Sequence, residues 1–150
     1  MFSLNNYGVV YTPNNLADFV AELLFDEVNN IAGNVINEVN ILDPACGEGI
    51  LLHTISKFFK SKSNILPINY GIDVDENVIK SDRQLSPKAN FNFIHQNTIL
   101  PSSSLSADNY WKRRIKNISC IIANPPWSAE KVFDNSDLNN AGYKFGIGQS

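Results

Sequence analysis

Asn124, Pro125, Pro126 and Trp127 end an apolar run, and their types suit chemistry on an amino group. The run from Ser119 to Ala123 predicts a fully buried strand, which a proline pair cannot continue. Because proline removes backbone donors and restricts the residue before it, the Asn124 side chain and the Pro125 carbonyl become two fixed acceptors for an NH2 group. Trp127 can stack on a flat base. An ordinary strand-terminating turn with a packed tryptophan is the alternative interpretation.

A glycine loop upstream follows a short strand at Ile41 and precedes a helix predicted over Ile50 to Lys60. The loop residues are Asp43, Pro44, Ala45, Cys46, Gly47, Glu48 and Gly49. Glycines let the backbone pass close to a ligand, and the helix amino end offers unpaired N–H groups. The loop lacks the Lys-Ser/Thr of a P-loop and the spacing of the dinucleotide fingerprint, and its carboxylates oppose a phosphate. These acidic side chains fit a ligand that carries an ammonium or sulfonium group.

Asp73 ends the next predicted strand, which begins at Asn69. A carboxylate at that position can bind both hydroxyls of a ribose. Asp75 stands ahead of a helix predicted over Glu76 to Gln84, where an N-cap is the simpler role. Asp73 is therefore the predicted ribose ligand.

With these motifs in this order, the chain resembles the S-adenosylmethionine-dependent N6-adenine DNA methyltransferases of restriction-modification systems. The family's first signature is similar to Asp43–Gly49, and its Asn/Asp/Ser-Pro-Pro-aromatic signature is similar to Asn124–Trp127. A Tyr-Thr-Pro segment is a further family mark, and here 11–13 precedes a helix predicted over Asn14 to Val28. From the residues alone, Thr12 and the proline after it are an N-cap and a first helical residue.

The resemblance implies S-adenosylmethionine as the cofactor and a set of residues that bind it. Those residues are Tyr11, Thr12, Asp43, Pro44, Ala45, Cys46, Gly47, Gly49, Asp73, Val74, Asn97, Thr98 and Asn124. Asn97 stands where family members usually have an Asp that meets the amino group of the cofactor's adenine, and its amide still offers a carbonyl acceptor.

The implied reaction is direct methyl transfer to a flipped adenine, whose N6 attacks the sulfonium methyl. Its catalytic residues are Asn124, Pro125, Pro126 and Trp127. No metal is implied, because His53 and His95 show no ligand spacing with the two cysteines. Cys46 is interpreted as a small loop residue.

The fold class implied is α/β, a Rossmann-like methyltransferase fold with a parallel sheet and flanking helices, truncated after the fourth strand. Strands are predicted near Ile41, Tyr70, Phe93 and Ile121. The resemblance implies three divisions of the chain: an amino-terminal helical segment at 1–30, a cofactor-binding half-sheet at 38–127 and a loop after the catalytic turn at 128–150. The target-recognition domain is expected to be absent.

In the expected family order, the strand at 120–123 becomes an exposed apolar edge. Such edges recruit other chains, so we expect self-association or a partner subunit there. We also expect the 150-residue chain not to methylate DNA unaided.

Composition indicates one compact core, because 150 residues with 43% hydrophobic content hardly build two. A net charge of -3 is not the footprint of a DNA-binding surface, so double-stranded DNA is expected to be held mostly by absent residues. One local basic group consists of Lys112, Arg113, Arg114 and Lys116. No segment approaches the roughly 20 apolar residues of a membrane span and no leader is visible, so a cytoplasmic location is expected.

Three functions remain open at this point. The first is the DNA adenine methyltransferase. The second is a protein-glutamine or RNA N-methyltransferase, which uses the same turn but usually has Tyr or Phe where this chain has Trp127. The third is a non-catalytic cofactor-binding or assembly subunit. The DNA target sequence cannot be inferred from these residues.

Overall fold

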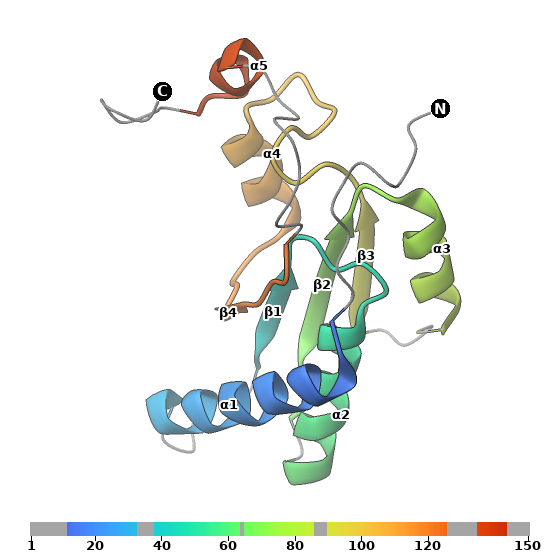
Figure 1. The fold of residues 1–150 in the computed structure, drawn as a ribbon. Coiled ribbons are helices and arrows are strands. Elements are labelled where there is room, and N and C mark those ends of the chain that lie inside the picture. The colour runs from blue at the N-terminus through green and yellow to red at the C-terminus, as the bar shows by residue number, and fades with distance from the viewer. Residues whose placement is uncertain (1–11, 33–37, 64, 86–89, 126–134, 144–150) are drawn as a thin grey trace.

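Four parallel strands form one sheet in the part of the chain that the computed structural model describes, residues 12–32, 38–63, 65–85, 90–125 and 135–143 (Figure 1). These strands are β1 (Asn40–Asp43), β2 (Ile68–Asp73), β3 (Phe91–His95) and β4 (Cys120–Ile121). The described helices are α1 (Asn14–Ala32), α2 (Ile50–Lys62), α3 (Glu76–Leu85), α4 (Ala107–Arg114) and α5 (Asn135–Asn140). The predicted α/β class with a parallel sheet and flanking helices is confirmed.

The strand order is β3-β2-β1-β4, so the sheet grows first on one side of β1 and then on the other. β1 pairs with β2 along its whole length, and with β4 at Ile41 opposite Cys120 and Leu42 opposite Ile121. Because every pair is parallel, the carboxyl ends of the four strands lie at the same edge. In open α/β sheets, ligands bind outside the carboxyl ends at the point where the strand order reverses.

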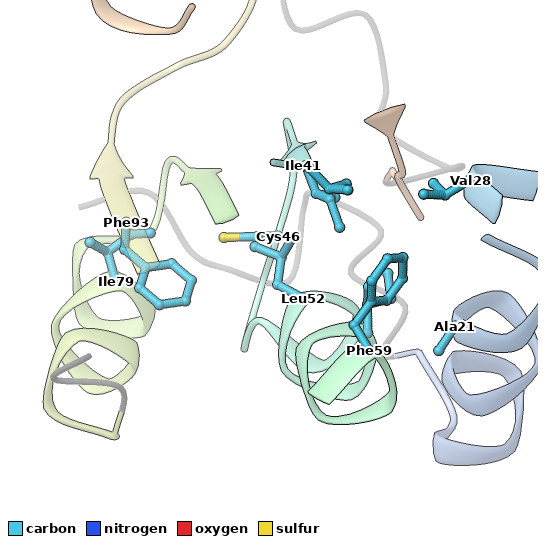
Figure 2. Close-up of a cluster of buried hydrophobic side chains, with 10 residues drawn as sticks. Ala21, Val28, Ile41, Cys46, Leu52, Phe59, Ile79 and Phe93 are labelled. Atoms are coloured by element: carbon cyan, nitrogen blue, oxygen red, sulfur yellow. The ribbon is translucent and has the colours of Figure 1, made fainter. Parts of the chain in front are cut away.

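An apolar core joins α1 and α2 to the sheet. Phe25 of α1 packs edge-on against Phe58 and Phe59 of α2, with ring centroids 5.6 and 5.0 Å apart. Figure 2 shows Cys46 within the core, with its sulfur on the side of Phe93. The buried members are Ala21, Val28, Val39, Ile41, Cys46, Leu52, Ile55, Phe59, Ile79 and Phe93.

The first helix begins differently from the sequence-based expectation. Pro13 O accepts from Ala17 N at 3.0 Å, so Pro13, and not Thr12, is the residue that caps α1. The Thr12 hydroxyl instead contacts Asn124, as described below. The helix also continues to Ala32, past the predicted end at Val28.

The predicted fully buried strand over 119–123 is wrong in length and in burial. β4 contains only two residues, and the side chain of Ile121 is 67% exposed. The neighbouring Cys120 and Ile122 pack against the core, so successive side chains alternate between a covered and an uncovered face. Since β4 pairs only with β1 in the described part of the chain, it is the open edge that was also expected.

The segment after the catalytic turn contains a short helix, α5, where a loop was expected. Two hydrogen bonds link the residues after α5 to the start of α4 and to the turn after β3: Ala107 N donates to Ala141 O at 3.0 Å, and the Tyr143 hydroxyl donates to Ile99 O at 2.8 Å. Figure 1 shows α5 beside α4. None of the described helices is long and apolar enough to cross a membrane.

Candidate cofactor site and catalytic turn

The glycine loop is bound to the end of β2 through its backbone. Cys46 N donates to Ile72 O at 2.9 Å, and Gly47 N donates to Asp73 Oδ2 at 2.9 Å. Asp43 Oδ1 accepts from Ala45 N at 3.1 Å, which closes the turn after β1. The structure therefore brings the two predicted carboxylates together through one loop.

Two positive φ angles give this loop its shape. Gly47 has φ 50° and Gly49 has φ 66°, a region that side-chain-bearing residues rarely adopt. A Cβ at Gly47 would meet no atom within 4 Å, whereas one at Gly49 would meet His53 and Asp82. Gly47 thus leaves an open side at which a ligand can approach the backbone, and Gly49 lies against packed side chains.

Asp73 ends β2, as predicted, and organises the chain around it. Its Oδ1 accepts from Asp75 N at 2.9 Å while Oδ2 accepts from Gly47, and each carboxylate oxygen has a further lone pair. Asp75 Oδ1 accepts from Asn77 N at 2.9 Å, which is the expected cap of α3. Val74 follows Asp73 in the chain and is about half exposed, so apolar surface is available next to the end of β2.

Asp43 and Cys46 lie inside the loop. Burial raises the pKa of Asp43 to about 6, the hydrogen bond from Ala45 N opposes the rise, and the charge of Asp73 adds to it. Burial also raises the pKa of the Cys46 thiol, which keeps the thiol protonated and unsuited to nucleophilic attack. Only 1% of Asp43 is exposed, so its part in the site is to close the turn and to contribute negative charge.

The turn after β3 places Asn97 and Thr98 beside the glycine loop. The Thr98 hydroxyl donates to Pro44 O at 2.6 Å, so the two turns are joined. Asn97 Oδ1 accepts from Ile99 N at 2.9 Å and from Leu100 N at 2.8 Å. These two bonds occupy the carbonyl that was expected to meet an adenine amino group, so binding there would have to displace one of them.

The predicted catalytic turn begins at Asn124, which lies beside the start of the chain's first helix. Asn124 Nδ2 donates to Thr12 Oγ1 at 3.2 Å, and Ile122 N donates to Leu42 O at 2.9 Å. Asn124 is half-buried and Pro125 is exposed. The other predicted residues of this part of the site lie outside the described residues: Tyr11, Pro126 and Trp127.

Both histidines have local partners. His53 packs against the rings of Phe91 and Phe93, at centroid distances of 4.9 and 5.9 Å, and His95 Nε2 lies 3.1 Å from Val74 O. Within the described ranges, no three His, Cys, Asp or Glu side chains are grouped as a metal ion requires.

Sequence reasoning missed two residues that shape this region. Gln96 Oε1 accepts from Asn97 N at 2.9 Å and from Ser102 N at 3.2 Å, so it fixes the turn after β3. Asp82 is only 1% exposed and its carboxylate approaches Gly49. A signal for its burial was present, because Asp82 follows the apolar Ile79 by three residues and so shares its helix face.

Comparison with known proteins indicates the same family as the sequence motifs do. The sequence model of the family described as N-6 DNA Methylase matches residues 3–148. A curated relative, the type II methyltransferase M.BanIII of Aneurinibacillus aneurinilyticus, is 31% identical over 138 residues. The match covers 83% of this chain and 23% of the relative, so the chain spans about a quarter of that protein's length.

The fold has a counterpart among solved structures. A structure from Listeria monocytogenes, described as a putative class I S-adenosylmethionine-dependent methyltransferase, superposes with a TM-score of 0.61 at 23% identity. The superposition covers 84% of this chain and 34% of that one, and it shows a shared fold. Taken with the family match over residues 3–148, these findings establish that the chain belongs to the N-6 DNA methylase family.

Proposed function

We propose that this chain binds S-adenosylmethionine and carries the catalytic turn of a methyltransferase that modifies N6 of adenine in double-stranded DNA. One observation carries the proposal: the catalytic turn and the glycine loop meet at one sheet edge. The bond from Ile122 N to Leu42 O places the strand leading to Asn124 directly beside the strand leading to Asp43. The family to which the chain belongs supports the same chemistry.

The described residues fit this cofactor. The open side of Gly47 admits a ligand to the loop backbone, and Asp73 has lone pairs suited to two ribose hydroxyls. Asp43 and Asp73 supply negative charge near a cationic ligand, and exposed Val74 offers apolar surface for a base. When bound, the cofactor supplies a methyl group on a sulfonium. Tyr11 belongs to the same proposal and lies outside the described residues.

The catalytic turn would hold and orient the adenine amino group. Asn124 Nδ2 donates a hydrogen bond to Thr12 Oγ1, which orients the amide and with it the side-chain carbonyl. That carbonyl and the Pro125 carbonyl accept the two N6 hydrogens, which favours a pyramidal, nucleophilic nitrogen. Pro126 stiffens the turn and Trp127 stacks on the flipped base.

DNA is the proposed partner, although this chain supplies few of the expected phosphate contacts. Its basic group lies at the end of α4, where Lys112 pairs with Asp108 at 2.7 Å and the Arg114 guanidinium lies 4.4 Å from the centroid of the Tyr110 ring. We infer that most DNA contacts come from other parts of the whole protein and that it acts in the cytoplasm within a restriction-modification system. Self-association or a partner subunit at β4 belongs to the same proposal and is supported by exposed Ile121.

Calorimetric titration with S-adenosylmethionine tests the cofactor half of the proposal. The chain should bind, Asp73→Asn should bind at least tenfold more weakly, and Asn124→Ala should bind within about threefold of the wild type. Asp108→Asn on α4 is the matched control, because it removes an exposed carboxylate away from the loop. Equal affinity in the Asp73 variant would remove Asp73 from the site.

Methyl transfer is tested in a chimera in which this chain replaces the matching segment of the Aneurinibacillus relative, with the unaltered relative as the control. Labelled cofactor is offered with DNA, RNA or a glutamine-containing protein, and the modified group is identified after digestion. N6-methyladenine in DNA supports the proposal. Label in RNA or on glutamine selects the second function, and binding without transfer selects the non-catalytic subunit.

A further inference from the structure

Asp82 is a buried carboxylate to which neither the motifs nor the proposed reaction assigns a role. It lies on α3 with 1% of its surface exposed, and its Oδ2 accepts no hydrogen bond within the described structure. A Cβ built at Gly49 would lie 3.3 Å from Asp82 Oδ2 and 3.2 Å from His53 Nε2. The unpartnered oxygen is therefore directed at the glycine loop, and a buried acceptor left unpaired is costly.

The titratable groups near Asp82 come from several elements. Glu48 lies in the loop, Asp73 ends β2, and His53 projects from α2. Arg83, the next residue on α3, places its guanidinium on Phe93 O at 2.7 and 3.1 Å. Burial, then Glu48 and then Asp73 raise the pKa of Asp82 to about 7, and burial lowers the pKa of His53. Near pH 7 about half of the Asp82 carboxyl groups therefore carry a proton, and the lowered pKa of His53 favours its neutral imidazole.

We propose that Asp82 is a positioning residue beside the glycine loop that is partly protonated in the free protein at neutral pH and releases its remaining proton to solvent when a cationic cofactor binds at the loop. The inference rests on the proposed function, because it requires S-adenosylmethionine to bind at the loop. That cofactor has a net positive charge, since it carries a sulfonium and an ammonium group but only one carboxylate. A bound cation stabilises the ionised form of a nearby carboxyl. By linkage, the cofactor then binds more tightly as pH rises through the range in which Asp82 ionises.

Asp82 interacts electrostatically with a residue that is bonded to the loop. The charge of Asp73 acts on Asp82, and Asp73 also accepts from Gly47 N, so charge on Asp82 affects the loop and the proposed ribose ligand together. In the free protein, a neutral Asp82 avoids a third negative charge beside Glu48 and Asp73. In the bound protein, the positive ligand offsets that charge, and the ionised carboxylate in turn strengthens the attraction.

The direct test is proton release on binding, measured by titrating S-adenosylmethionine at pH 7 in two buffers of different ionisation enthalpy. The wild type should release a fraction of a proton, and its dissociation constant should fall several-fold between pH 6 and pH 8. Asp82→Asn should release almost none and show a flat profile. Glu76→Gln is the matched control, because it removes an exposed carboxylate from the same helix and should behave as the wild type.

S-adenosylhomocysteine, which lacks the sulfonium charge, should cause less proton release from the wild type. If the Asn variant does not fold, two other measurements test the ionisation of Asp82. The first is proton release by Asp82→Ala, and the second is the carboxyl ¹³C shift of Asp82 in the wild type, followed with and without ligand. Equal proton release in the wild type and in both Asp82 variants would overturn the inference alone. Failure of the folded wild type to bind S-adenosylmethionine would overturn the proposed function, and this inference with it.

Discussion

Thr12 Oγ1 accepts a hydrogen bond from Asn124 Nδ2 at 3.2 Å, across 112 residues of sequence. The bond joins the segment that precedes α1 to the residue proposed to hold the target amino group. Because the Thr12 hydroxyl is used in this way and Pro13 caps the helix, the segment positions the catalytic turn in addition to its proposed contact with the cofactor.

Thr12→Val should remove the hydrogen bond to Asn124 while it keeps the shape of the side chain. A hydrogen bond of this kind contributes about 1 kcal/mol, so the melting temperature should fall by roughly 2–4 °C. Transfer by the chimera should fall more than cofactor affinity, because Asn124 loses its fixed orientation. Thr12→Ser keeps the hydroxyl and should restore both. A valine variant with unchanged transfer would show that the bond does not position Asn124.

Gly71→Ala should destabilise the fold strongly. A Cβ at Gly71 would lie 2.6 and 2.7 Å from two ring atoms of Phe93 and 3.0 Å from Cys46 Sγ, and both side chains are buried. Overpacking of this kind costs about 1–3 kcal/mol, which thermal melting would register. A companion substitution, Phe93→Leu, should relieve part of the loss. Gly71→Ala with wild-type stability would mean that the core yields more readily than the distances indicate.

Gly47→Ala should reduce cofactor affinity more than it reduces stability. Its Cβ would meet no atom of the protein, so only the positive φ is penalised, by roughly 1–2 kcal/mol. The added methyl would occupy the open side of the loop, and cofactor affinity should fall at least tenfold in calorimetry. If the folded variant binds as the wild type does, the cofactor does not approach the loop at Gly47.

Asp82→Asn should change how stability depends on pH. The pKa of Asp82 is raised from 3.8 to about 7, so between these values the unfolded chain has lost a proton that the folded chain keeps. The wild type therefore loses stability as pH rises through this window, and the loss is complete above about pH 7. In thermal melts from pH 4 to pH 8, the free energy of unfolding of the variant should rise relative to that of the wild type. The relative gain should be on the order of 2 kcal/mol at the upper end of this range.

Asp43 and His53 also shape the pH dependence of wild-type stability. Asp43, whose pKa is raised to about 6, also lowers stability as pH rises from 3.8 to about 6. His53 acts in the opposite direction, because its lowered pKa makes the unfolded chain bind more protons below about pH 6.5. A constant difference between Asp82→Asn and the wild type across pH 4–8 would contradict the assigned protonation of Asp82.

Ile121→Lys should weaken self-association through β4. Ile121 is 67% exposed on an edge strand, and a lysine there adds charge that opposes strand addition. Sedimentation equilibrium should show a lower mass for the variant if the wild type associates through this edge. Ile99→Lys, a change at another exposed apolar residue that lies outside β4 in the turn after β3, is the control and should leave the mass unchanged.

Local sequence was sufficient for much of the cofactor site. A strand, a glycine loop and a helix follow one another within a few residues, so Ile50 was correctly placed as the start of α2, and Asp73 as the end of β2. The role of Thr12 could not be predicted in this way, because its partner Asn124 lies 112 residues away. The exposure of Ile121 likewise depends on which strands flank β4, and that is a property of the assembled sheet.

The hydrogen-bond partners of side chains also could not be predicted from the sequence. Asn97 was identified by its place after β3, but the capture of its carbonyl by Ile99 N and Leu100 N follows from the turn that Gln96 stabilises. For Asp82 the sequence contains two opposing signals. Its spacing from the apolar Ile79 indicates a shared helix face, whereas an acidic residue type favours exposure, and the packing of α3 in the folded chain decides for burial.

The strand order has a consequence for how the protein emerges from the ribosome. β1, β2 and β3 pair in the order of their synthesis, so the loop at Gly47 and its anchor at Asp73 can form once residue 95 is available. β4 joins the other side of β1 later, because its partner residues begin at Cys120. We therefore expect the nascent chain to assemble its ligand-binding half before it has a catalytic turn, an order that protease resistance of stalled chains of increasing length would reveal.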